Sequence, residues 1–131
     1  MDQLPNSQIR VLAIDDNLFD REMYVTALTS AGYSVDTADN GVDGLAMLKS
    51  NNYDVVLLDL ILPKLSGYEL LKTWRQTVPH GQRPAFIVLT NYEQTDEIKK
   101  DIVSLVDAYA VKVELTPRRL REIIANITKS R

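Results

Sequence analysis

The run Val55-Val56-Leu57-Leu58-Asp59 decides the fold of this 131-residue chain. Its four apolar residues follow one another without the alternation expected of a strand that has one face in water. A continuous apolar run of this length predicts a strand covered on both faces, as in a parallel sheet. Phe86-Ile87-Val88-Leu89 repeats the pattern. Together the two runs predict a buried parallel sheet with helices packed on both sides.

Working outward from these runs, the sequence alternates strand candidates with helix candidates. Segments rich in Val, Ile and Leu predict five strands: Ile9 to Ile14, Tyr33 to Ala38, Asp54 to Asp59, Ala85 to Thr90, and Ala108 to Val111. Four intervening stripes have helical spacing: Phe19, Met23, Ala27 and Leu28; Gly67, Leu71, Trp74 and Val78; Ile98, Ile102, Leu105 and Val106; Leu120, Ile123, Ile124 and Ile127. A weaker helix is predicted from Gly41.

Boundary signals agree with this pattern. Ser66 followed by Glu69 is a capping box, and Thr116-Pro117 places proline at a first helical position. Gly32 suits the end of the first helix, and residues 78–84 predict a loop. Five strict β-α repeats predict a doubly wound α/β sandwich, because right-handed crossovers place helices on both faces of the sheet.

Composition limits the possible functions. The chain is 45% apolar and 25% charged, which suits one globular domain, expected over residues 9–131 after a polar lead-in at residues 1–8. The absence of cysteine excludes disulfides, thiolate zinc sites and cysteine nucleophiles, and it suits a reducing cytosol. No apolar run approaches the roughly 18 residues of a membrane span, and a net charge of -3 does not favour nucleic-acid binding.

The ends of the predicted strands carry the polar chemistry. Asp15-Asp16 closes the first strand, Asp59 the third and Thr90 the fourth, and Lys112 follows the fifth. In doubly wound sheets ligands collect beyond the carboxyl ends of the strands, so these side chains are expected to meet. Three neighbouring carboxylates repel one another unless a cation intervenes, and Mg²⁺ prefers such oxygen ligands.

Each of these residues also has a simpler interpretation. Asp15-Asp16 could cap the following helix, Thr90 could cap another, Lys112 could be solvated, and Tyr109 could be a half-buried strand residue. Their conjunction favours a site. Asp59 beside a metal would be a good nucleophile toward phosphorus, since phosphoryl transfer requires mainly alignment and neutralisation of charge.

From about Gln8 to Lys129 the chain resembles the receiver domain of two-component response regulators. The resemblance rests on Asp15-Asp16, on the run from Asp59 to Gly67, and on Thr90, Tyr109 and Lys112. It implies a flavodoxin-like, three-layer (βα)5 sandwich with strand order 2-1-3-4-5. It also implies a cytoplasmic switch with only weak self-phosphorylating and self-dephosphorylating activity.

The resemblance assigns roles to these residues. Asp59 would be the phosphoacceptor, and Mg²⁺ (or Mn²⁺) would be bound by Asp16, Asp59 and the Ile61 carbonyl, with Asp15 acting largely through water. Thr90 and Lys112 would contact the phosphoryl oxygens. Thr90 and Tyr109 would then form a switch that remodels the face made by the fourth helix, fifth strand and fifth helix.

The partners implied are a histidine kinase or histidine phosphotransfer protein as donor, a downstream protein as listener, and a possible homodimer. Neither nucleic acid nor membrane is implied. The basic cluster Arg118, Arg119 and Arg121 is expected to decorate the last helix beside the output face.

Several positions depart from the family pattern. Val113 replaces the usual proline after the lysine, Asn91 replaces a small residue after the threonine, and Leu62 replaces a common methionine. Ile61 and Tyr92 occupy the positions that flank the route of the hydrolytic water. An apolar Ile61 and a bulky Tyr92 should hinder the water, so they predict a long-lived aspartyl phosphate.

Three alternatives remain open at this stage. Val113 and Asn91 would suit a degenerate receiver that binds partners without phosphorylation. A metal-dependent phosphatase with an aspartyl nucleophile would need a second acid where Ile61 stands. A flavodoxin-like electron carrier would need a phosphate-binding loop where Asp15-Asp16-Asn17 stands.

Overall fold

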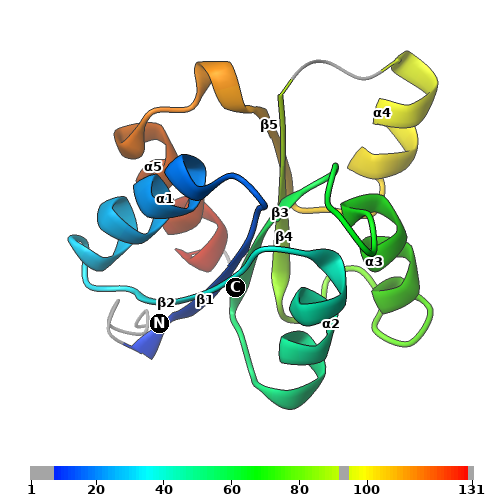
Figure 1. The fold of residues 1–131 in the computed structure, drawn as a ribbon, viewed down its shortest axis with the longest axis horizontal. Coiled ribbons are helices and arrows are strands. Elements are labelled where there is room, and N and C mark those ends of the chain that lie inside the picture. Colours follow the sequence, from blue (N-terminus) through cyan, green and yellow to red (C-terminus); the bar gives the residue numbers. More distant parts are fainter. Residues whose placement is uncertain (1–7, 92–94, 130–131) are drawn as a thin grey trace.

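The computed structural model describes residues 8–91 and 95–129. Its strands are β1 (Arg10–Ile14), β2 (Ser34–Ala38), β3 (Val55–Asp59), β4 (Ala85–Thr90) and β5 (Ala108–Val111). Its helices are α1 (Leu18–Thr29), α2 (Gly41–Ser50), α3 (Gly67–Arg75), α4 (Asp96–Val103) and α5 (Pro117–Lys129) (Figure 1). All strand pairs are parallel, in the order β2-β1-β3-β4-β5. The predicted doubly wound sandwich is therefore confirmed.

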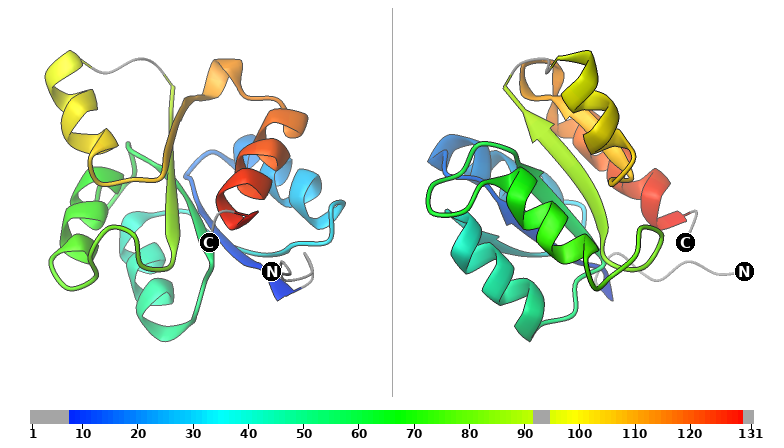
Figure 2. Two further views of the ribbon diagram at one scale, coloured as in Figure 1. Left: turned by 180° about the vertical axis from the view of Figure 1, so that it is seen from behind. Right: turned by 90° about the vertical axis from the view of Figure 1, so that its right-hand side faces the viewer.

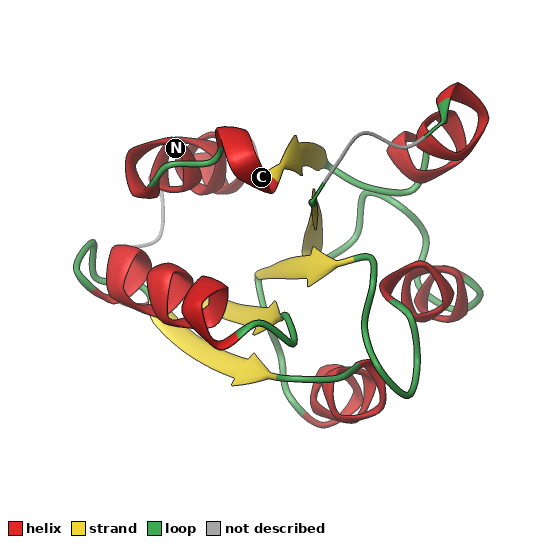
Figure 3. Ribbon diagram, turned by 45° about the horizontal axis from the view of Figure 1, so that its top comes forward, coloured by secondary structure: helices red, strands yellow, loops and turns green. Residues whose placement is uncertain are grey.

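The helices form two layers, one on each face of the sheet. Figure 2 shows α1 and α5 side by side on one face, and α2, α3 and α4 cover the other. Figure 3 shows the sheet between them. Among the described residues, no helix combines the length and the apolar character that crossing a bilayer requires.

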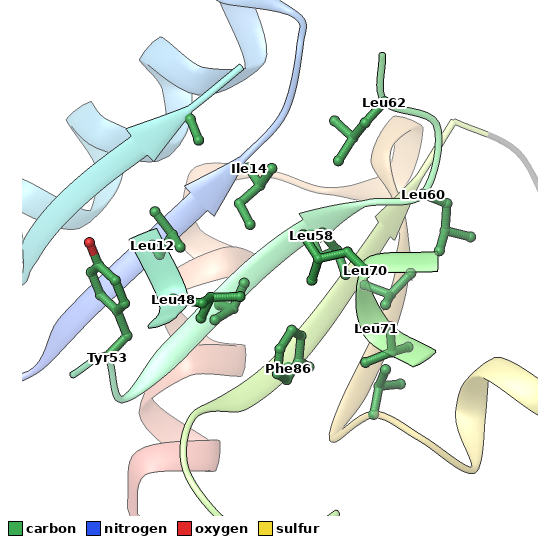
Figure 4. Close-up of a cluster of buried hydrophobic side chains, with 14 of the residues drawn as sticks. Leu12, Ile14, Leu48, Tyr53, Leu58, Leu60, Leu62, Leu70, Leu71 and Phe86 are labelled. Carbon is green, nitrogen blue, oxygen red and sulfur yellow. The ribbon is translucent and has the colours of Figure 1, made fainter. Parts of the chain in front are cut away.

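Two apolar clusters hold the layers together, and β3 and β4 contribute to both because every residue of these strands is buried. Figure 4 shows the cluster under α2, α3 and α4, in which Leu58 and Phe86 meet Leu70 and Leu71. The second cluster joins Leu57 to residues of α1 and α5. Burying each large apolar side chain contributes about 1.5–3 kcal/mol, so this double coverage is the main source of stability.

Local signals set the helix ends as predicted. Ser66 Oγ accepts the Glu69 N–H at 3.1 Å at the start of α3, and Thr116 Oγ1 accepts the Arg119 N–H at 3.0 Å at the start of α5. Gly67 allows α3 to begin directly against the end of β3. A Cβ at this position would lie 2.0 Å from the Asp59 carbonyl oxygen, so any other residue would push α3 away.

Two predicted stripe positions are wrong. Phe19 is 80% exposed and Ile98 is 42% exposed, whereas the spacing placed both against the core. Both lie in the first turn of a helix that starts at the carboxyl edge of the sheet, so this turn overhangs the edge and does not cover the strands. The buried face of α1 is formed by Tyr24, Ala27 and Leu28.

Candidate functional site

The strand register brings the predicted site residues to one edge of the sheet. Ile14 pairs with Leu58, so the next residues, Asp15 just after β1 and Asp59 at the end of β3, lie at the same level. Farther along the sheet, Thr90 pairs with Val111, so Lys112 comes one step beyond Thr90. These four predicted site residues therefore line the carboxyl edge, as the sequence predicts.

Three carboxylates gather at this edge. Oxygens of Asp15, Asp16 and Asp59 all lie within 4.8 Å of one another. Asp15 and Asp59 are buried, with 1% and 4% of their surface exposed, while Asp16 faces solvent. Burial raises the pKa of Asp59 to about 6; the nearby Lys112 opposes this rise and the Asp15 charge adds to it.

Lys112 supplies the positive charge. Its Nζ lies 2.6 Å from Asp15 Oδ2, 2.9 Å from Asp20 Oδ2 and 3.3 Å from Asp59 Oδ2, and its side chain is only 9% exposed. Burial acts to lower the pKa of Lys112, but the hydrogen bonds to Asp15 and Asp20, together with the negative charges of Asp59 and Asp15, outweigh burial and raise it. The alternative of a solvated lysine is therefore wrong, and all three ammonium hydrogens have carboxylate acceptors.

Asp15 is held by groups from several directions. Its Oδ2 accepts the Tyr24 hydroxyl at 2.8 Å as well as Lys112, and its Oδ1 accepts the Asn17 N–H at 2.9 Å. Asn17 caps α1 by accepting the Asp20 N–H at 2.9 Å. Capping therefore belongs to Asn17, and the predicted alternative role of Asp15-Asp16 as the cap is wrong.

Asp20 and Tyr24 are site residues that the sequence prediction missed. They stand four residues apart on α1, so they lie on one face of the helix, and each contacts the charged cluster. In the sequence, Asn17 followed three residues later by Asp20 is the ordinary pattern of a capped helix start, so it does not indicate a site. Tyr24 is likewise indistinguishable in the sequence from an aromatic residue on the buried face of a helix.

Thr90 and Tyr109 lie on adjacent strands. Thr90 is 1% exposed at the end of β4, while α4 starts at Asp96 and is capped by Thr95, so the prediction that Thr90 could cap a helix is wrong. The Tyr109 hydroxyl oxygen is buried and has no hydrogen-bond partner among the described residues. The Lys99 ammonium lies 5.3 Å from the centre of the Tyr109 ring.

The positions that depart from the family pattern surround the site. The Ile61 N–H donates to Asp59 Oδ1 at 3.3 Å, and the Ile61 side chain is 55% exposed. Val113 is 84% exposed within a 3₁₀ turn over Lys112–Glu114, and within the described ranges the single cis peptide is Arg83-Pro84. Tyr92 lies outside the described residues.

The donor set fits a divalent cation. Four carboxylates face a single ammonium, so the edge carries excess negative charge in an environment that is partly buried. The Asp15 oxygens already accept three donors, whereas no described group donates to the Asp16 carboxylate. Asp15, Asp16 and Asp59 can therefore hold a hard cation, with Asp16 keeping its acceptor capacity and Asp59 accepting only two long bonds, both of 3.3 Å.

Comparison with known proteins defines the class. Residues 11–125 match the response regulator receiver domain, so the chain belongs to this family of two-component signalling modules. It is 39% identical over 120 residues to the transcriptional regulatory protein QseB of Haemophilus influenzae and 32% identical over 119 residues to the response regulator MprA of a Mycobacterium species. Each match covers 91% of this chain but 51% and 49% of those relatives. The chain thus spans about half their length.

Solved receiver structures show the same architecture. The response regulator protein TrrA of Thermotoga maritima, in complex with Mg(2+)-BeF, has a TM-score of 0.77 and 32% identity, covering 92% of this chain and 99% of that chain. A CheY-like receiver domain protein of Methanospirillum hungatei has a TM-score of 0.81 and 27% identity, covering 93% and 94%.

Proposed function

We propose that Asp59 accepts a phosphoryl group from a phosphohistidine of a kinase or phosphotransfer protein. A carboxylate oxygen of Asp59 forms the new P–O bond, the donor's P–N bond breaks, and the imidazole leaves with the bonding pair and takes a proton. The observation that carries this proposal is the buried Asp59 carboxylate at 3.3 Å from Lys112 and beside two further carboxylates. Burying this carboxylate costs stability, because burial raises its pKa despite the nearby Lys112, and a chemical role accounts for its retention.

The other residues of the edge have separable roles in this proposal. Asp16, Asp59 and the Ile61 carbonyl would hold Mg²⁺ or Mn²⁺, with Asp15 connected largely through water because its oxygens are already occupied by protein donors. The cation supplies positive charge to the phosphoryl oxygens. Lys112 and the Thr90 hydroxyl would contact these oxygens and orient the group for in-line transfer.

Output is proposed to pass through Thr90 and Tyr109 to the face formed by α4, β5 and α5. The buried Tyr109 hydroxyl lacks a described partner, and an unsatisfied buried hydroxyl costs about 1–3 kcal/mol. The Tyr109 side chain would therefore exchange between two positions. A phosphoryl group that attracts the Thr90 hydroxyl would shift the equilibrium between these positions. A downstream protein or a second copy of the chain would read the altered face.

The test is to incubate the metal-free protein with MgCl2 and acetyl phosphate and to measure the intact mass. Wild type is expected to gain one phosphoryl mass, and Asp59→Asn is expected to gain none. Asp43→Asn is the matched control, because Asp43 is another helix-starting acid that lies outside the cluster. No gain in wild type with any small phosphodonor would refute the proposal and favour the degenerate receiver.

A further inference from the structure

The contact between Asp20 and Lys112 has no role in the proposed transfer. Asp20 lies in the first turn of α1, its side chain is 33% exposed, and its Oδ2 is 2.9 Å from the buried Lys112 ammonium. The two residues are 92 positions apart in the sequence, so only the folded chain brings them together.

We infer that Asp20 is a positioning residue that holds Lys112 toward α1 and away from Asp59. This inference rests on the proposed function, because it assigns Asp20 control over how readily Asp59 is phosphorylated. The Asp59 bond is the longest of the three that Lys112 makes, at 3.3 Å against 2.6 Å to Asp15 and 2.9 Å to Asp20. The two shorter bonds place the ammonium nearer the α1 side of the site.

Asp20 therefore has opposite effects on cation binding at this edge and on phosphorylation of Asp59. Its negative charge adds to the attraction for a divalent cation. When a phosphoryl group arrives on Asp59, however, Lys112 must move toward β3, which lengthens the bond to Asp20, and the Asp20 charge opposes the incoming negative oxygens. Asp20 thus favours metal binding and disfavours phosphorylation.

A purely structural role for Asp20 is the competing explanation, and the chain contains its own control. Asp43 in α2 starts its helix in a similar way, because Asn40 Oδ1 accepts the Asp43 N–H at 2.8 Å as Asn17 Oδ1 accepts the Asp20 N–H; Asn40 Nδ2 also donates to Asp43 Oδ2 at 2.8 Å. No described lysine or arginine pairs with Asp43. Asp43→Asn therefore removes a helix-starting acid without touching Lys112.

The first experiment measures Mg²⁺ affinity by isothermal titration calorimetry and the initial rate of phosphorylation by acetyl phosphate at saturating Mg²⁺. Asp20→Asn is expected to weaken Mg²⁺ binding and to speed phosphorylation, each by about threefold to tenfold. This is the size of effect expected when one charge is removed whose interactions are partly screened by solvent. Asp20→Glu keeps the charge and is expected to restore both values. Values for Asp20→Asn that match those of Asp43→Asn would overturn the inference.

The second experiment needs no metal and no phosphodonor. Urea unfolding of the metal-free protein compares Asp20→Asn in the wild-type and Lys112→Met backgrounds. Asp20→Asn should destabilise the wild type, because it removes an ion pair, and should stabilise Lys112→Met, because there Asp20 faces only like charges. Equal effects in the two backgrounds would overturn the inference. If wild type takes up no phosphoryl group, the proposed function fails, and this cycle alone decides whether Asp20 positions Lys112.

Discussion

Leu58 and Asp59 are neighbours in β3, and they are almost equally inaccessible, with 0% and 4% of their surface exposed. Leu58 belongs to the apolar cluster under α2, α3 and α4, so its burial stabilises the fold. Asp59 is buried beside a second carboxylate, so its burial opposes the charged form. Nearly equal burial therefore has opposite energetic consequences at two adjacent residues.

This contrast separates the part of the molecule that stabilises it from the part to which we assign the phosphoryl transfer. The interior of the sheet contributes free energy of folding, and the carboxyl edge consumes some of it to hold a reactive carboxylate in a partly dry, prearranged position. Changes in the interior should lower stability, whereas neutralising Asp59 should raise it.

The largest expected effect comes from the interior. Phe86→Ala should lower the free energy of unfolding by about 3–5 kcal/mol, because the Phe86 ring is fully buried in the cluster of Figure 4 and its loss leaves a cavity. Urea unfolding followed by circular dichroism measures the change. A loss below about 1 kcal/mol would mean that the two regions differ less than their packing indicates.

The edge should respond in the opposite direction. In metal-free protein at pH 7.5, Asp59→Asn should raise the free energy of unfolding by about 3 kcal/mol, because the folded state no longer holds a carboxylate whose pKa is raised from 3.8 to about 6. The substitution keeps the shape of the side chain and removes its charge. The same urea measurement applies.

The pH dependence follows with the same sign. Between about pH 4 and pH 6 the folded state binds the Asp59 proton more tightly than the unfolded state, so wild-type stability should fall as the pH rises through this range. Asp59→Asn should lack this fall. An equal slope in both proteins, or a variant less stable than wild type at pH 7.5, would contradict the assignment of the raised pKa to Asp59.

A smaller loss of stability is expected when the hydrogen bond from Tyr24 to Asp15 is removed. Tyr24→Phe should lower stability by about 1 kcal/mol, since it removes the hydroxyl that donates to Asp15 Oδ2 but leaves the ring in the core. Tyr33→Phe provides a comparison on the same face of the sheet, away from the carboxylates. Equal losses in the two variants would mean that the bond to Asp15 contributes nothing specific.

The smallest effect concerns the lifetime of the phosphoryl group. Replacing both Ile61 and Tyr92 with polar residues, as in Ile61→Asn with Tyr92→Gln, should shorten the lifetime about threefold to tenfold, equivalent to about 1 kcal/mol in barrier height. Loss of the phosphoryl mass is timed after the phosphodonor is removed. An unchanged lifetime would show that these two side chains do not hinder water.

The fold and the gathering of the five predicted residues could be derived from local sequence. Continuous apolar runs such as Val55 to Leu58 indicate double coverage of the strands, and the ends of parallel strands share one edge, so Asp15, Asp59 and Thr90 were expected to meet. The capping box at Ser66 was equally visible. These signals are strong because each depends on neighbours in the chain.

The contributions of α1 could not be derived in this way. Spacing alone placed Phe19 in the core, but the first turn of α1 extends past the strand ends and directs Asp20 toward Lys112. That orientation depends on where Asn17 starts the helix relative to the end of β1. The periodicity of the helix carries no information about this position along the strand.

The 97 residues that separate Asp15 from Lys112 make the site a test of complete folding. A nascent or truncated chain that ends before β5 would carry every carboxylate of the cluster and lack the buried ammonium that joins them. Under the proposed function, such a chain would lack the positive charge that contacts the phosphoryl oxygens. Only molecules whose last strand is in place would then accept a phosphoryl group, and partly folded copies would remain silent.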